Sequence, residues 1–114
     1  MHETSVAQSM IDVILKESHK QGMIPICAKI SCGQLNTLND EVFGFAFKAI
    51  AKGTLCQDIT LDINHKTLQG KCDTCAATFD LDFSNPLCSA CQGSEFKILP
   101  DAPLLLEEIE FQEE

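Results

Sequence analysis

The pattern of apolar and polar residues predicts two helices in the first half of the chain. The first spans residues 5–21, with Ser5 as its N-terminal cap and Gly22 placed to end it in a left-handed conformation. The second spans about residues 40–52, with Thr37, Asn39 or Asp40 as the cap. Each carries an apolar stripe at helical spacing, formed by Val6, Met10, Val13 and Ile14 in the first and by Phe43, Ala46, Phe47 and Ile50 in the second.

Strict alternation of apolar and polar residues predicts strands between and after these helices. Residues 24–33 and 59–66 alternate in this way, and residues 104–111 form a last strand that needs a partner, for which the first sheet is the obvious candidate. His65 falls on the apolar side of its strand, which predicts a buried or partly buried role. His19 falls on the polar face of the first helix and is expected in solvent. The inward side of the first strand should comprise Ile24, Ile26, Ala28, Ile30 and Cys32.

From about residue 70 to residue 93 the apolar periodicity stops and paired cysteines take over. Cys72 and Cys75 form one Cys-x-x-Cys pair, and Cys88 and Cys91 form another after twelve intervening residues. Each pair on a tight turn directs two thiolates to one point, and two facing turns make a tetrahedral sulfur site. A closed set of four thiolates leaves no position for water or substrate. The spacing therefore predicts a zinc ribbon with a structural metal.

Two other interpretations of these cysteines were weighed. Disulfides are disfavoured because the start of the chain shows no export signal, so we expect a reducing cytoplasm. A rubredoxin-like iron site uses the same ligands, and spacing alone does not separate it from zinc. Cys27 and Cys32 have opposite strand parity, so they should not bind one metal ion together. Cys32 is expected in the core and Cys56 in the core or a loop, and no functional role is assigned to any of these three thiols.

The amino terminus offers a second set of metal donors. Met1 should be retained before the bulky His2, so the Met1 amine, the His2 amide and the His2 imidazole can close two fused chelate rings. Glu3 could supply a fourth donor. Planar, nitrogen-rich donor sets favour Ni(II) or Cu(II) over Zn(II). Taken alone, a histidine after the initiator methionine is usually an accident.

Composition removes several classes of function. A net charge of −9 with eight basic residues argues against binding to nucleic acid. The chain contains no run of about 18 apolar residues, so we expect no transmembrane helix. No phosphate-binding loop, catalytic triad or cofactor fingerprint is present, so we expect no enzymatic activity. The acidic residues near the end are read as a solvated tail: Glu107, Glu108, Glu110, Glu113 and Glu114.

The chain resembles the HypA family of hydrogenase-maturation nickel chaperones along nearly its whole length. The opening Met1-His2-Glu3 leads into a capped helix, as in that family, and the paired Cys-x-x-Cys motifs occupy the corresponding place. Further matching segments are residues 30–35, 45–47 and 51–54 and the late strand ending at residues 109–110.

This resemblance implies an α+β architecture, in which two helices on a small sheet form a nickel-binding domain that carries an inserted zinc ribbon. The expected domains are residues 1–66 with 101–114 for nickel binding and residues 67–100 for the ribbon. The family's nickel site corresponds to His2 and Glu3. Its zinc ligands correspond to Cys72, Cys75, Cys88 and Cys91. The cargo would be delivered to the large subunit of [NiFe]-hydrogenase, or to urease, with a partner GTPase, by a monomer or homodimer.

The chain departs from the family pattern in three respects. Gln34 stands where a glutamate is common, and Ser89 stands where the second cysteine pair often has proline. Some members add a nickel donor near the start of the second helix, for which Asn39 and Asp40 are both candidates here. The rival interpretation is a zinc-ribbon adaptor that has no role in nickel transfer, and a third is a thiol redox protein.

Overall fold

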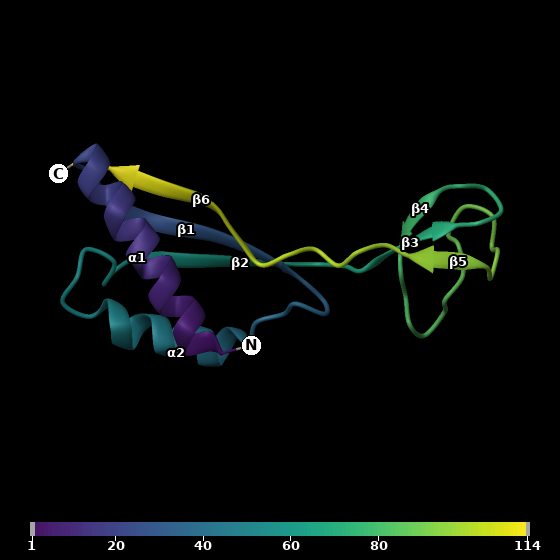
Figure 1. Cartoon of the computed structure of the whole chain (residues 1–114), viewed down its shortest axis with the longest axis horizontal. Coiled ribbons are helices and arrows are strands. Elements are labelled where there is room, and N and C mark those ends of the chain that lie inside the picture. The colour runs from purple at the N-terminus through teal and green to yellow at the C-terminus, as the bar shows by residue number, and fades with distance from the viewer. Residues whose placement is uncertain (1, 114) are drawn as a thin grey trace.

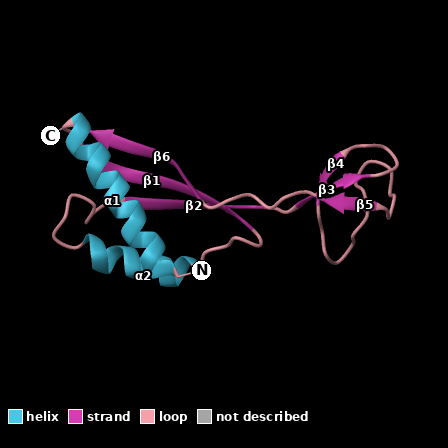
Figure 2. Ribbon diagram, in the orientation of Figure 1, coloured by secondary structure: helices cyan, strands magenta, loops and turns pink. Residues whose placement is uncertain are grey.

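The computed structural model describes residues 2–113, which form an elongated molecule with extents of 54 × 25 × 16 Å. Figures 1 and 2 show two helices over a sheet at one end and a small sheet at the other, joined by two extended segments. Neither described helix has the length and hydropathy needed to cross a membrane. The elements in chain order are α1 (Glu3–Gln21), β1 (Ile24–Gly33), α2 (Asp40–Ala51), β2 (Thr60–Lys66), β3 (Gln69–Cys72), β4 (Thr78–Asp80), β5 (Phe96–Ile98) and β6 (Leu105–Gln112).

The larger sheet has the strand order β2-β1-β6. β1 pairs in parallel with β2 and antiparallel with β6, so the last strand does return to the first sheet. β1 lies in the middle, which explains why Ala28, Ile30 and Cys32 are at most 2% exposed. This α+β arrangement of two helices with two small sheets confirms the predicted fold class.

The prediction that Ile26 points inward is wrong. The register between β1 and β6 shifts between Pro25 and Cys27, so Ile26 is an extra residue at an irregularity in the pairing. Because side chains alternate with a period of two, this insertion exchanges the two faces before it. Pro25 is buried and Ile26 is 37% exposed.

Helix α1 begins at Glu3 rather than at Ser5, so the predicted serine cap is also wrong. His2 is the N-cap residue in an extended conformation, with no side-chain cap, and its carbonyl accepts the Val6 N–H at 3.1 Å. Acidic Glu3 suits the first turn because it lies near the positive end of the helix dipole. The C-terminal end matches expectation: Gly22 has φ +65° and donates its N–H to Ser18. His19 is exposed, as predicted.

Among the three predicted caps of α2, the structure selects Asn39, whose Oδ1 accepts the Val42 N–H at 3.1 Å. Helices α1 and α2 pack against each other on one face of the sheet (Figure 1). Phe43 and Phe47 lie in this core with ring centroids 5.9 Å apart. The buried core cluster comprises Ala7, Met10, Ile11, Ile14, Ala28, Ile30, Leu38, Phe43, Ala46, Phe47, Ala51 and Cys56.

The smaller sheet has the order β4-β3-β5, with both pairings antiparallel. Its core is slight: Leu68, Phe79 and Leu81 are buried together with Cys72 and Cys88. Phe79 meets Phe96 edge to face at a centroid distance of 5.4 Å, and a β-carbon on Gly70 would collide with the Phe79 ring at 2.9 Å and crowd the Phe96 ring at 3.2 Å. This sheet lies within residues 67–100, although the exact domain boundaries stay a prediction.

The loop after β1 contacts both segments that connect the two sheets. Gln34 Oε1 accepts the Leu68 N–H at 2.6 Å on the outgoing segment. On the returning segment, Asp101 Oδ2 accepts the N–H groups of Leu35 and Asn36, both at 2.8 Å. Gln34, which departs from the family's glutamate, therefore helps to hold a connector.

Most of the acidic run lies in the predicted last strand, and its carboxylates are exposed, as the sequence interpretation expected. Glu107, Glu108 and Glu110 belong to β6. Lys29 Nζ lies 3.1 Å from Glu108 and 3.2 Å from Glu110, so neighbouring lysine partly balances the acidic charge. These pairs are exposed, and each contributes little to stability.

Candidate metal centres

The two Cys-x-x-Cys pairs meet at one point beside the smaller sheet. Cys72 Sγ lies 3.5 Å from Cys91 Sγ, and Cys75 Sγ lies 3.6 Å from Cys88 Sγ. All four sulfurs are within 4.8 Å of one another. A zinc ion with four sulfurs at about 2.3 Å makes a tetrahedron with edges of about 3.8 Å, so the four thiols fit that ion.

The two cysteine turns repeat the same hydrogen bonds. In the first, the Cys72 carbonyl accepts the Ala76 N–H at 3.0 Å; in the second, the Cys88 carbonyl accepts the Gln92 N–H at 2.9 Å. Ala76 and Gln92 both have left-handed backbones, with φ of 63° and 65°. A β-carbon on Gly93 would lie 3.2 Å from Cys91 Sγ, so this position leaves little room beside the sulfurs. The two turns therefore present their cysteine pairs to the shared centre with the same local backbone geometry.

Backbone N–H groups prepare two of the thiols for ionisation. The N–H of Cys75, 3.5 Å from Cys72 Sγ, is foremost in lowering the pKa of Cys72 to about 6. The N–H of Cys91 likewise lowers the pKa of Cys88. At Cys91 the Gly93 N–H acts in the same direction, but the Cys72 and Cys75 sulfurs outweigh it and raise the pKa to about 12. A bound divalent cation supplies the positive charge that four adjacent thiolates require.

The other three cysteines lie apart from this cluster. Among residues 2–113, the four clustered thiols are the one group of three or more potential ligands that comes this close together. Burial raises the pKa of the Cys27 and Cys56 thiols, and Cys56 belongs to the main core, as expected. Cys32 is fully buried.

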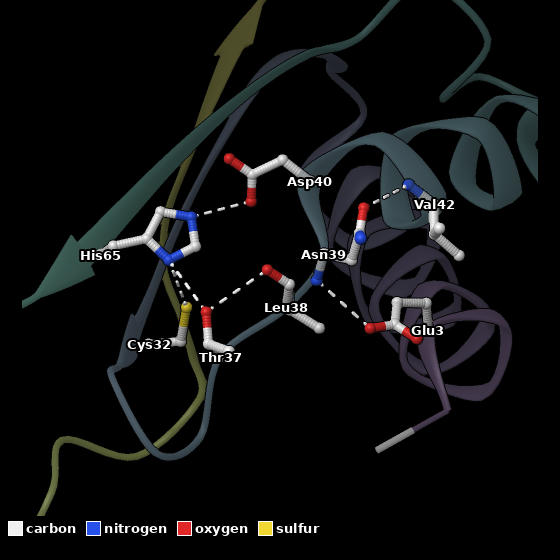
Figure 3. Close-up of polar contacts among 8 residues, drawn as sticks. All are labelled: Glu3, Cys32, Thr37, Leu38, Asn39, Asp40, Val42 and His65. Carbon is white, nitrogen blue, oxygen red and sulfur yellow. Dashed lines mark hydrogen bonds and ion pairs between the residues drawn. The ribbon is translucent and has the colours of Figure 1, made fainter.

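At the amino terminus, the structure brings Glu3 to the start of α2. Glu3 Oε2 accepts the Asn39 N–H at 3.2 Å, and this hydrogen bond lowers the pKa of the carboxyl (Figure 3). His2 is exposed beside it in the chain, and the possible Met1 donor lies outside the described residues. Two helix starts therefore meet where the sequence places the nickel donors.

Asn39 and Asp40, the two candidates for an additional nickel donor, face different partners. Asn39 contacts Glu3, whereas Asp40 Oδ1 lies 2.8 Å from Nε2 of His65 (Figure 3). The His65 side chain is 39% exposed, so His65 lies at the surface and is not buried as its strand parity predicted, and polar contacts hold it in place. The sequence did not predict the group around His65, although its place opposite Cys32 follows from pairing the two predicted strands in register.

A family model and two relatives, all named HypA, each match most or all of this chain. The family model HypA, described as hydrogenase/urease nickel incorporation, metallochaperone, matches residues 1–111. The hydrogenase maturation factor HypA of Pelodictyon phaeoclathratiforme is 29% identical over 100% of this chain and 98% of that relative. The corresponding factor of Chlorobaculum tepidum is 31% identical over 86% of this chain and 88% of its own length.

Solved structures show the same fold. The solution structure of the Ni metallochaperone HypA from Helicobacter pylori matches with a TM-score of 0.63 over 100% of both chains, at 23% identity. A second structure, described as the solution structure of HypA protein, gives a TM-score of 0.69 at 22% identity and covers 100% of this chain and 98% of that one. With a family match that extends from residue 1 to residue 111 and a four-cysteine cluster suited to structural zinc, the chain belongs to the HypA family of nickel metallochaperones that serve hydrogenase and urease.

Proposed function

We propose that this chain carries Ni(II) at its amino terminus and delivers it to [NiFe]-hydrogenase, or to urease, during assembly of the active site. His2 and Glu3 bind the ion together with the Met1 amine. The contact between Glu3 and the Asn39 N–H carries this proposal, because it fixes the first turn of α1 against α2 and leaves His2 exposed. Glu3 Oε1 is not used in that contact and remains available as a donor.

In this proposal the zinc-ribbon domain, residues 67–100, has a structural role. Cys72, Cys75, Cys88 and Cys91 hold zinc in a closed shell, which suits permanent retention rather than transfer. A few donors at a chain end suit exchange. The chain is a carrier and not an enzyme; a partner GTPase supplies nucleotide hydrolysis, the large subunit of [NiFe]-hydrogenase receives the metal, and the work takes place in the cytoplasm.

The test is nickel titration by native mass spectrometry on untagged, zinc-loaded protein that starts at Met1. His2→Ala should abolish the first nickel-binding step, whereas His19→Ala should leave it intact, because His19 is an exposed histidine on the same helix. Retained nickel binding in His2→Ala would exclude the proposed site. Glu3→Gln separates the roles of Glu3: a small loss points to its backbone as the donor, and a large loss to its carboxylate.

A second variant tests the amine and the rival adaptor role together. One glycine added before Met1 turns the amine into an amide and moves the free amine one residue away. Because the new terminus, with histidine third, is itself a competent planar nickel chelate, binding must be scored together with activation of a client enzyme. We expect an altered d–d spectrum of bound Ni(II) and reduced client activation. An adaptor that only recruits partners would keep full client activation with either the added glycine or His2→Ala.

A further inference from the structure

Cys32 and His65 come together on neighbouring strands of the larger sheet, beside the start of α2 and outside the four-cysteine cluster of the ribbon. They are register partners on the parallel strands β1 and β2. Cys32 Sγ lies 3.4 Å from His65 Nδ1, and Thr37 Oγ1 lies 3.2 Å from the same nitrogen (Figure 3). The Cys32 sulfur and the Thr37 hydroxyl oxygen thus both face Nδ1 of the His65 imidazole.

The other imidazole nitrogen is held by a carboxylate. His65 Nε2 lies 2.8 Å from Asp40 Oδ1, so a proton on Nε2 is donated to Asp40 and the lone pair on Nδ1 is directed toward Cys32 (Figure 3). Histidines that bind metals nearly always donate their second ring N–H to a carboxylate, a carbonyl or water, which fixes the tautomer and the ring orientation. Asp40 therefore stands where a supporting carboxylate for a metal-bound histidine would stand.

We propose that Cys32 and His65 form a further metal site, in addition to the ribbon and the amino terminus, for a borderline divalent cation of the d block, such as Ni(II) or Co(II). With metal–sulfur and metal–nitrogen bonds of about 2.3 and 2.05 Å, donors 3.4 Å apart subtend about 100° at the ion. That angle fits tetrahedral or square-planar coordination and rules out a linear two-coordinate ion. A thiolate with an imidazole suits borderline cations better than Mg(II) or Ca(II).

The exposure of the donor side chains indicates where the ion would enter and which groups would complete its coordination shell. Cys32 is fully buried, whereas His65 and Thr37 are exposed at the rim. The ion would enter from the rim and displace the contact between His65 and Thr37, with the Thr37 hydroxyl or water in the remaining positions. Cys32 and His65 lie on paired strands, so the backbone already holds the donors at a chelating separation and little ordering is required.

The competing interpretation is a hydrogen bond from the Cys32 thiol to Nδ1 that binds no metal. Titration of full-length protein with Co(II), with zinc already in the ribbon, separates the two. The proposed site gives a thiolate-to-cobalt charge-transfer band in the near ultraviolet without release of zinc. Absence of the band, or a band that appears only as zinc is released, would overturn the proposal.

Variants assign the band to particular residues. His65→Asn and Cys32→Ala should abolish it, whereas Cys27→Ala, at the other cysteine of β1, and His2→Ala should leave it unchanged. Asp40→Asn should weaken binding about 10- to 100-fold, the usual cost of removing a supporting partner. If the buried Cys32→Ala change prevents folding, the exposed His65→Asn change still decides. A band that survives His65→Asn would also reject the site, as would a band that is lost in His2→Ala, because cobalt binding would then depend on the amino terminus.

Discussion

The two ends of this molecule are held together by different forces. In the larger part, the buried cluster is built almost wholly from aliphatic and aromatic side chains of α1, α2 and β1. In the ribbon, the corresponding cluster has five members, and two of them are the thiols Cys72 and Cys88. Apolar burial therefore suffices for the first part, whereas the second needs metal coordination to offset the entropy of ordering its loops.

Removing one zinc ligand tests this contrast most severely. Cys72→Ser should reduce bound zinc from one ion per chain to none and unfold the ribbon, because structural zinc sites contribute about 10–16 kcal/mol of binding free energy to folding. Hydrogen exchange should show lost protection in β3, β4 and β5 and retained protection in α1 and α2. Cys27→Ser, a cysteine change outside the cluster, is the matched control. Loss of protection in both parts would show that the larger part depends on the metal as well.

Shortening a side chain in the apolar core should have the opposite result: it should destabilise the larger part and leave the ribbon and its zinc intact. Phe47→Ala removes a ring that is 2% exposed and should lower the free energy of unfolding of the larger part by about 3–5 kcal/mol. Phe45→Ala on the same helix removes a ring that is 79% exposed and should change it by less than about 0.5 kcal/mol. Urea unfolding measures both, and zinc content should stay at one ion per chain in each. Zinc loss from Phe47→Ala would contradict the independence of the two parts.

Relieving backbone strain should stabilise the ribbon alone. Ala76 has φ of +63°, and a left-handed conformation costs a non-glycine residue about 1–2 kcal/mol. Ala76→Gly also loosens the unfolded chain, so we expect a net gain of about 0.5–1 kcal/mol, seen as tighter zinc retention in a chelator competition. Ala90→Gly, in the second cysteine turn but without positive φ, should weaken retention. If both variants changed zinc retention in the same direction, backbone strain at Ala76 could not be the explanation.

The smallest expected effect concerns one carboxyl at the sheet. Ser31 donates its hydroxyl to Glu107 Oε1 at 2.5 Å and, with Lys66, lowers the pKa of that carboxyl. Because the pKa is lower in the folded protein, the stabilisation exists above the unfolded pKa and disappears as the pH falls through the folded one. Ser31→Ala should raise the Glu107 pKa, measured by NMR, and flatten this acid dependence. Ser9→Ala, an exposed serine on α1, should leave that pKa unchanged.

Features that depend on local chemistry were predictable from the sequence. Gly22 ends α1, and the Cys-x-x-Cys spacing brings four sulfurs together, because few other conformations suit those residues. The return of β6 to the first sheet was also predictable, since an amphipathic strand needs a partner.

What the sequence missed depends on contacts between distant segments. Ile26 turns outward because of a register shift against β6, which alternation within β1 cannot reveal. Helix α1 extends to Glu3, and Glu3 contacts Asn39, 36 positions later. The group of Cys32, Asp40 and His65 requires both the register of β1 with β2 and the position of the α2 start. Cys32 and His65, which the sequence placed in unrelated structural roles, meet Asp40 only when these three elements are in place.

The acidic run on β6 has a further consequence for contacts between molecules. β6 is an outer strand of its sheet, and an outer strand offers unpaired backbone groups to any similar strand that approaches. Two copies meeting edge to edge at β6 would bring Glu107, Glu108 and Glu110 of one chain against the same carboxylates of the other. Their repulsion opposes growth of the sheet into larger aggregates, so this acidic strand protects an edge that the fold leaves open.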